Sequence, residues 1–213
     1  MKFKREHWGW VHLLTCFGLI GAYWMWGKQP LSLGLIPVWP VIILGVVPFG
    51  MIFWPFKISF KSLGLSRPKS AKRLWALYLL ILVGSPLVVL IGMKMSGVAN
   101  FYGSLFPVGT SIAYKLLALG SFVLVSTTTL EFFFRCFFLM GHRHFPVLSN
   151  SAVAVLVVIA EVIVHLQKPA VEAAGMGVLS ALLCFVTLRT QSVVPAFLLH
   201  LWVEAWFVAS FFL

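Results

Sequence analysis

Long apolar runs separated by short polar segments dominate the pattern of hydrophobic and polar positions along this chain. A membrane-spanning α-helix needs about 20 mostly apolar residues. The runs that meet this requirement lie near residues 8–26, 34–55, 74–93, 117–140, 151–167, 174–189 and 193–212. Pro37, Pro40 and Pro48 fall in the second run, so we expect a kinked or interrupted helix there. The pattern predicts an all-α fold, a polytopic transmembrane helical bundle of about seven spans.

The composition agrees with this fold class. Of the 213 residues, 61% are hydrophobic and 10% are charged. Such a balance leaves too little polar surface to cover a soluble domain of this size. No internal repeat or low-complexity segment divides the chain. We therefore expect one membrane domain over residues 1–213.

The basic residues lie mostly in the short segments between the predicted spans. The chain has 16 Lys and Arg against five acids, and its net charge is +11. With the N-terminus in the cytoplasm, the inside segments hold Lys2, Lys4, Arg5, Lys57, Lys61, Arg67, Lys69, Lys72, Arg73, Arg143 and Arg189. The outside segments hold Lys28, Lys94, Lys115 and Lys168, and Arg135 lies within a span. Because cytoplasmic loops carry the excess of Lys and Arg, we expect the N-terminus inside and the C-terminus outside.

This distribution of charge indicates a lipid bilayer, and not nucleic acid, as the partner of the basic residues. We expect residues 56–73 to form a basic cytoplasmic segment beside the membrane. We expect an integral membrane protein of the plasma membrane, and the short loops are compatible with a bacterial inner membrane. The sequence carries no signal for an oligomeric state.

Three of the last four predicted spans contain two ionisable residues four positions apart, a spacing that puts both on one helix face. The pairs are Glu131 with Arg135, Glu161 with His165, and His200 with Glu204. At about 1.5 Å of rise per residue, the three glutamates lie roughly 13 to 17 Å from the cytoplasmic ends of their spans. A charge in hydrocarbon costs about 2.5–3.5 kcal/mol on insertion scales. We therefore expect the pairs to meet in one functional cluster within the membrane.

Carboxylates and imidazoles in a site of low dielectric support several chemistries. A glutamate can act as a general base towards water while histidines hold an oxyanion. Two histidines and a carboxylate can also bind a catalytic metal. The same groups can relay protons in a transporter, although no inverted repeat is visible. Cys16, Cys136 and Cys184 have no ligand-like spacing, and we expect them to be packing residues.

Three motifs follow one another in the C-terminal half of the chain. They are LEFFFRCFF (130–138), HLQKPAVE (165–172) and GVLSALLCFVTLRTQSVVPAFLLHLWVE (177–204). In this order they resemble the motifs of the CPBP family, the CAAX prenyl endopeptidase and bacteriocin-processing (Abi) intramembrane proteases. The resemblance covers roughly residues 115–206, which makes this region the expected catalytic core. Residues 1–114 then supply N-terminal spans and a basic cytoplasmic loop.

The resemblance implies a glutamate-dependent endopeptidase that cleaves a peptide bond in a membrane-associated or C-terminal protein segment. It implies that Glu131 is the general base, that His165 is its partner and that His200 is an oxyanion donor. Arg135 would orient Glu131 and keep it ionised, whereas Glu161 has no fixed cation at this spacing. The expected partners are a protein or peptide substrate and the lipid bilayer, and we expect no metal and no cofactor.

The sequence departs from the family's pattern at three positions. Leu130 replaces the first glutamate of the usual pair, and Glu161 stands where an aromatic residue is usual and can supply a supporting carboxylate. Glu204 replaces the final asparagine and could donate to an oxyanion if it stays protonated. These departures keep an alternative open, which is a catalytically inactive homologue that acts as a membrane binding scaffold.

Lys168 and Glu172 follow His165 where the fifth predicted span emerges from the membrane. Their position leads us to expect that they line the outer mouth of the site. The alternative is an ordinary interfacial pair whose long side chains reach towards water.

Overall fold

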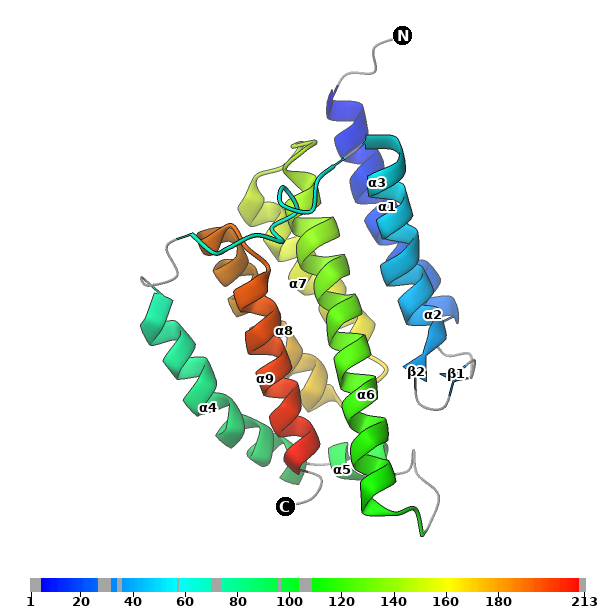
Figure 1. Ribbon diagram of the computed structural model, residues 1–213, viewed down its shortest axis with the longest axis vertical. Helices are drawn as coiled ribbons and strands as arrows, with labels where there is room; N and C mark the ends of the chain where they lie inside the picture. The colour runs from blue at the N-terminus through cyan, green and yellow to red at the C-terminus, as the bar shows by residue number, and fades with distance from the viewer. Residues whose placement is uncertain are drawn as a thin grey trace.

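The structure is a computed structural model that describes residues 5–26, 32–33, 36–56, 58–69, 74–95, 97–103 and 109–210. Figure 1 shows a bundle of helices. The elements, in chain order, are α1 (Arg5–Trp26), β1 (Ser32–Leu33), β2 (Ile36–Pro37), α2 (Val38–Val41), the π-helix η1 (Ile42–Val46), α3 (Val47–Phe56), α4 (Trp75–Lys94), α5 (Val98–Gly103), α6 (Ile112–Glu131), the π-helix η3 (Phe132–Met140), α7 (Asn150–His165), α8 (Ala170–Thr190) and α9 (Val194–Ser210).

This architecture confirms the predicted helical membrane bundle. Every predicted apolar run contains a helix within the described residues. In the part of the chain that the structure describes, three helices are long and apolar enough to cross a membrane, and they cover Trp75–Lys94, Ile112–Met140 and Ala170–Thr190. Shorter apolar helices cover Ile42–Met51, Asn150–His165 and Val194–Ser210. That α1 and the shorter helices also cross the membrane, which would give about seven spans, stays a prediction.

In the second apolar run a π-helical stretch interrupts the α-helical pattern, but the helix itself continues from residue 38 to residue 56. Its helix passes from α2 through η1 into α3, with Pro40 and Pro48 inside it, because a proline cannot donate the backbone hydrogen bond of a regular α-helix. Two small elements were not predicted. They are the antiparallel pair of β1 and β2, in which Leu33 lies opposite Ile36, and the short helix α5.

Two helices begin earlier than hydrophobicity alone predicts. Ser111 caps α6, and its Oγ accepts a hydrogen bond from the backbone N of Tyr114 at 3.3 Å. α8 begins directly after Pro169. Polar residues can occupy a first helical turn because caps and water satisfy its free N–H groups. The helices therefore extend beyond their apolar stretches.

The π-helix η3 lies in the middle of the hydrophobic core. Every residue from Phe133 to Met140 is buried, and such a helix belongs in the centre of a bundle. The rings of Phe133 and Phe137 stack with centroids 5.8 Å apart. Residues of α1 and α7 pack in the same cluster. α6 and η3 form one continuous helix, and Glu131 lies at the point where its α-helical part ends.

The loop of residues 58–69 crosses one end of the bundle and packs against the turn between α8 and α9. Lys69 N donates to Thr190 O at 2.7 Å, and Val193 N donates to Gly64 O at 2.9 Å. Gly64 has φ +85°, and a Cβ there would lie 3.0 Å from Val193 Cγ2, so glycine suits this contact. In Figure 1, α1 begins at this end of the bundle and α9 finishes at the opposite end.

Exposed basic side chains gather around the same loop. Lys61, Arg67 and Lys69 belong to it, and Arg143 donates a hydrogen bond to Gln191 in the neighbouring turn. The arrangement gives the bundle one basic end, but which side of the membrane that end faces stays a prediction. Some basic residues on which the topology prediction rests lie outside the described residues. They are Lys2, Lys4, Lys28, Lys57, Lys72 and Arg73.

Candidate active site

Arg135 joins two glutamates that come from different helices. Its Nη1 donates to Glu161 Oε2 at 2.6 Å and lies 3.4 Å from Glu131 Oε1. Glu161 belongs to α7, whereas Glu131 and Arg135 flank the junction of α6 and η3. All three side chains are at most 2% exposed. The sequence-predicted cluster therefore exists, and its centre is a guanidinium between two carboxylates.

Ser180 of α8 adds a third helix to this network. Its Oγ donates to Glu161 Oε2 at 2.5 Å and accepts from Arg135 Nη2 at 3.3 Å. The sequence analysis did not identify Ser180, although it lies within the third motif. A serine in a membrane helix is usually a packing residue, so only the contact with Glu161 and Arg135 reveals it.

Glu161 has a fixed cation that the i, i+4 spacing within its own helix does not supply. Arg135 lies nearer to Glu161 than to Glu131. The i, i+4 rule identifies neighbours on the same helix only, and this partner comes from η3. Because one guanidinium pairs with both carboxylates, it cannot distinguish Glu131 from Glu161 as the ionised residue.

His200 connects the network to α9. Its Nδ1 lies 2.7 Å from Glu131 Oε1. An ionised carboxylate oxygen only accepts hydrogen bonds, so Nδ1 carries the hydrogen and donates it. The other ring nitrogen, Nε2, lies 3.7 Å from Glu204 Oε1. The ring of His200 thus lies between a buried carboxylate and the partly exposed Glu204.

His165, at the end of α7, is also held through its Nδ1, but by a backbone carbonyl. Its Nδ1 lies 2.9 Å from the backbone oxygen of Glu161, which can only accept, so this nitrogen also carries the hydrogen. The hydrogen bond goes to Glu161 and not to Glu131, the partner that the resemblance implies. Glu204 and His200 are charged or polar neighbours of the His165 ring.

Lys168 and Glu172 form an ion pair beside these histidines. Lys168 Nζ donates to Glu172 Oε1 at 2.6 Å, and the hydroxyl of Tyr102 donates to the same oxygen at 2.8 Å. Burial acts to lower the pKa of Lys168, but the oxygens of Tyr102, Glu172 and Glu204 outweigh it and raise that pKa above its ordinary value. Lys168 is therefore a cation at neutral pH.

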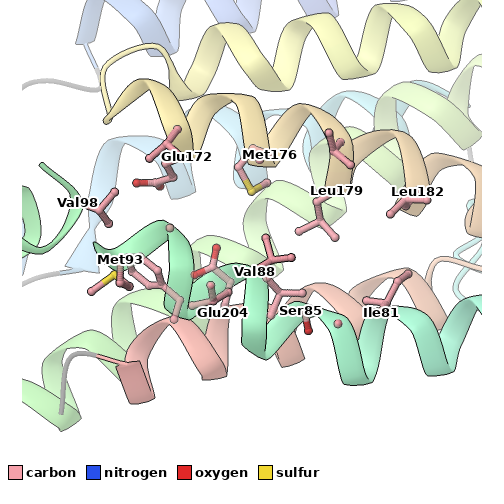
Figure 2. A pocket seen from close by; sticks show the side chains of 18 of the residues that line it. Ile81, Ser85, Val88, Met93, Val98, Glu172, Met176, Leu179, Leu182 and Glu204 are labelled. Carbon is pink, nitrogen blue, oxygen red and sulfur yellow. The ribbon is translucent and has the colours of Figure 1, made fainter. Parts of the chain in front are cut away.

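A cavity of about 440 Å³ lies between α4 and α8, and α9 forms its third wall (Figure 2). Glu172 and Glu204 line it, whereas Glu131, His165 and His200 do not. His200 connects Glu204 to the buried network behind the cavity wall. The other lining residues are mostly aliphatic and include Ile81, Val88, Val89, Met93, Met176, Val178, Leu179, Leu182 and Val203.

Residues 112–206 match a family model described as Rce1-like, type II CAAX prenyl endopeptidase. This region is similar to the CAAX protease family. The match confirms the predicted resemblance and spans α6, η3, α7, α8 and α9, which supply every residue of the buried network. No curated protein and no solved structure matches the chain significantly. Similarity to the CAAX proteases supports a peptide hydrolase of the membrane in general.

Within the matched region, Leu130 lies where the resemblance implies a first glutamate. Its side chain packs, partly buried, against the hydrophobic core that contains η3. The position therefore supplies no carboxylate to the site. The acidic groups near the histidines come instead from Glu131, Glu161 and Glu204.

Among the described residues of the matched region, Glu131, Glu161 and His200 could hold a metal ion. One ligand atom from each lies within 4.8 Å of the others. Arg135, however, lies against both carboxylates. A divalent cation there would share its ligands with a guanidinium and be repelled by it. The donor set thus fits a metal ion poorly while Arg135 stays in place.

Proposed function

We propose that this protein is a glutamate-dependent intramembrane endopeptidase that hydrolyses a peptide bond in a membrane-associated or C-terminal segment of another protein. The observation that carries the proposal is the link from Glu131 through the His200 ring to Glu204. It leads from a buried carboxylate to a carboxylate in the wall of the cavity. Carboxylate and imidazole in such a relation form a general base of known type.

The reaction needs one water molecule beside Glu204. The 3.7 Å between His200 Nε2 and Glu204 Oε1 exceeds a direct hydrogen bond and suits a bridging water. The water oxygen attacks the carbonyl carbon, and its proton moves to Nε2. Glu131 then stabilises the resulting imidazolium. When the C–N bond breaks, His200 returns the proton to the leaving nitrogen.

These roles differ from those that the resemblance implies, because His200 takes the proton and Glu204 binds the water. Glu131 is 2% exposed and does not line the cavity, and its Oε1 already accepts from His200. In the proposed reaction Glu131 therefore acts through His200 and does not bind the water itself. His165 lies beside Glu204 and would help to orient the water, while Arg135 and Glu161 hold Glu131 in place.

The proposed reaction takes place within the bilayer. Membrane-spanning helices and the family support an integral membrane protein. We propose a plasma membrane of bacterial type with a cytoplasmic N-terminus, a single domain over residues 1–213, and residues 115–206 as the catalytic core. Lys168 and Glu172 would lie at the outer mouth of the site, next to the cavity that Glu172 lines.

The test is cleavage of a library of apolar, membrane-embedded peptides by the purified protein in detergent, analysed by mass spectrometry. The parent protein should release defined products, and a His200→Ala variant that remains folded should release none. Equal cleavage by the parent and by His200→Ala would overturn the proposal.

A second candidate function is a catalytically inactive scaffold that binds a membrane partner. The observation that favours it is the pairing among Arg135, Glu131, Glu161 and Ser180, which makes this network suited to hold three helices together. The absence of a carboxylate at Leu130 also favours an inactive scaffold. A parent protein that binds peptides from the library but cleaves none would support this function.

A further inference from the structure

The cavity between α4 and α8 is apolar, and glycines leave parts of its wall without side chains. Gly84 and Gly92 of α4 and Gly175 of α8 line it, and a Cβ at each of the three would meet nothing within 4 Å. Aliphatic side chains supply most of the remaining wall (Figure 2). Such a surface suits an apolar ligand that lies close to the two helices.

The polar atoms of this cavity are not all satisfied within the protein. Ser85 Oγ and Glu172 Oε2 are buried and have no hydrogen-bond partner among the described residues. Figure 2 shows Glu172 and Glu204 reaching towards the same part of the cavity from α8 and α9. A buried polar atom without a partner is costly, so a ligand that fills the cavity should supply partners here.

Around this part of the cavity the described residues supply two carboxylates, Glu172 and Glu204, and one fixed cation, Lys168. Lys168 neutralises one carboxylate through its contact with Glu172 Oε1. Within the described part of the chain, the cationic group in ion-pair range of Glu204 is the His200 ring, at 3.7 Å. If His200 is neutral before the reaction, one negative charge is left over beside an apolar surface.

We propose that the cavity binds the substrate as a short apolar peptide segment with one lysine or arginine, whose cationic group lies between Glu172 and Glu204. This inference rests on the proposed function and names its substrate class. The aliphatic wall takes the apolar residues, and Ser85 Oγ donates to a backbone carbonyl of the segment. Glu172 Oε2 and the carboxylate of Glu204 accept from the cation.

A purely hydrocarbon ligand fits these observations less well. It would fill the apolar wall but leave Ser85 Oγ and Glu172 Oε2 unpaired and dry, which opposes binding. The basic side chain of a peptide has an apolar stem and a charged end, which matches the change along the cavity from aliphatic residues to carboxylates. Since Glu204 takes part in both binding and hydrolysis, the cleaved bond should lie close to the basic residue.

The test is the binding of labelled, leucine- and alanine-rich peptides to the full-length protein in detergent, measured by fluorescence anisotropy. One peptide carries a central lysine, the second carries norleucine at that position, and the third is a farnesylated peptide without a basic residue. We expect the lysine peptide to bind about tenfold more tightly than the norleucine peptide. Glu172→Gln should reduce this preference at least severalfold, and Glu172→Asp should retain most of it.

A second pair of variants tests the place of binding. Gly84→Leu puts a side chain into the cavity and should weaken binding of all three peptides. Gly120→Leu, on an exposed face of α6 where a Cβ also meets nothing within 4 Å, should change nothing. Equal binding of the lysine and norleucine peptides, or tightest binding of the farnesylated peptide, would overturn the inference, as would equal effects of the two glycine variants.

Mass spectrometry of the recovered peptides separates this inference from the proposed function. Selective binding of the lysine peptide without any cleavage would refute the endopeptidase and leave the binding site standing. Cleavage without preference for a basic residue would refute the proposed binding site and leave the endopeptidase standing.

Discussion

Arg135 lies 2.6 Å from Glu161 but 3.4 Å from Glu131, the residue four positions before it in the sequence. The closer pair joins η3 to α7, so the shorter contact crosses between helices. One fully buried guanidinium therefore connects the first predicted motif to a glutamate that lies outside all three motifs. This contact is a physical reason for a glutamate at position 161.

Replacing Arg135 with methionine should destabilise the protein strongly. The change leaves two buried carboxylates without their cation, and the loss of one partner of a buried ion pair costs about 3–5 kcal/mol. Thermal unfolding in detergent measures the effect. Arg189→Met, at an exposed arginine of α8, is the control and should change the free energy of unfolding by no more than about 0.5 kcal/mol. Equal stability of the two variants would contradict the role given to Arg135.

Glu131→Gln should lower the cleavage rate by about 100- to 10,000-fold, the range for loss of general acid–base catalysis. A neutral amide cannot stabilise the His200 imidazolium, although it can still accept from Nδ1. Glu161→Gln should have a smaller effect, because the amide oxygen can still accept from Arg135 and Ser180. The measurement is cleavage in matched detergent preparations with equal unfolding temperatures. Full activity of Glu131→Gln would refute the assignment.

Glu204→Asn should retain measurable activity, because an asparagine carbonyl can still accept a hydrogen bond from the water. Glu204→Leu is nearly as large but has no acceptor, and it should be inactive. Steady-state cleavage of one library peptide by the two variants decides the question. Equal rates would show that position 204 does not hold the reacting water.

Chelators should leave the activity unchanged. The three groups with metal-binding geometry, Glu131, Glu161 and His200, are already engaged with Arg135 or with one another. Cleavage is compared before and after dialysis against a strong chelator of divalent metals, and metal content is measured on the same samples. Activity that disappears on dialysis and returns with Zn²⁺ would place a metal in the mechanism.

Reporter fusions at Lys69 and at the C-terminus should report opposite sides of the membrane, with Lys69 in the cytoplasm. The loop that contains Lys69 packs against the start of α9, and α9 runs from there to the other end of the bundle (Figure 1). The basic end should face inwards because cytoplasmic loops retain Lys and Arg. Fusions that report the same side would refute this topology.

Much of the site could be predicted from single helices. Apolar runs of helical length require a membrane bundle, since their composition cannot cover a soluble surface. Buried ionisable residues four positions apart must share a helix face, and this rule identifies Glu131 with Arg135, Glu161 with His165 and His200 with Glu204 from the sequence alone. The order of the three motifs indicated the family, and the family match confirmed it.

Contacts between helices were beyond the reach of the sequence. Its periodicity does not say which helices adjoin or how they are rotated, so it could not bring Ser180 to Glu161 or His200 to Glu131. These contacts depend on the packing of η3 against α7 and α8 and of α9 beside them. The cavity depends on packing as well, because its walls are glycines and aliphatic residues that are common in any membrane helix. The sequence thus determined the kind of protein and most of its polar residues, while tertiary packing decided which of them pair and which reach the cavity.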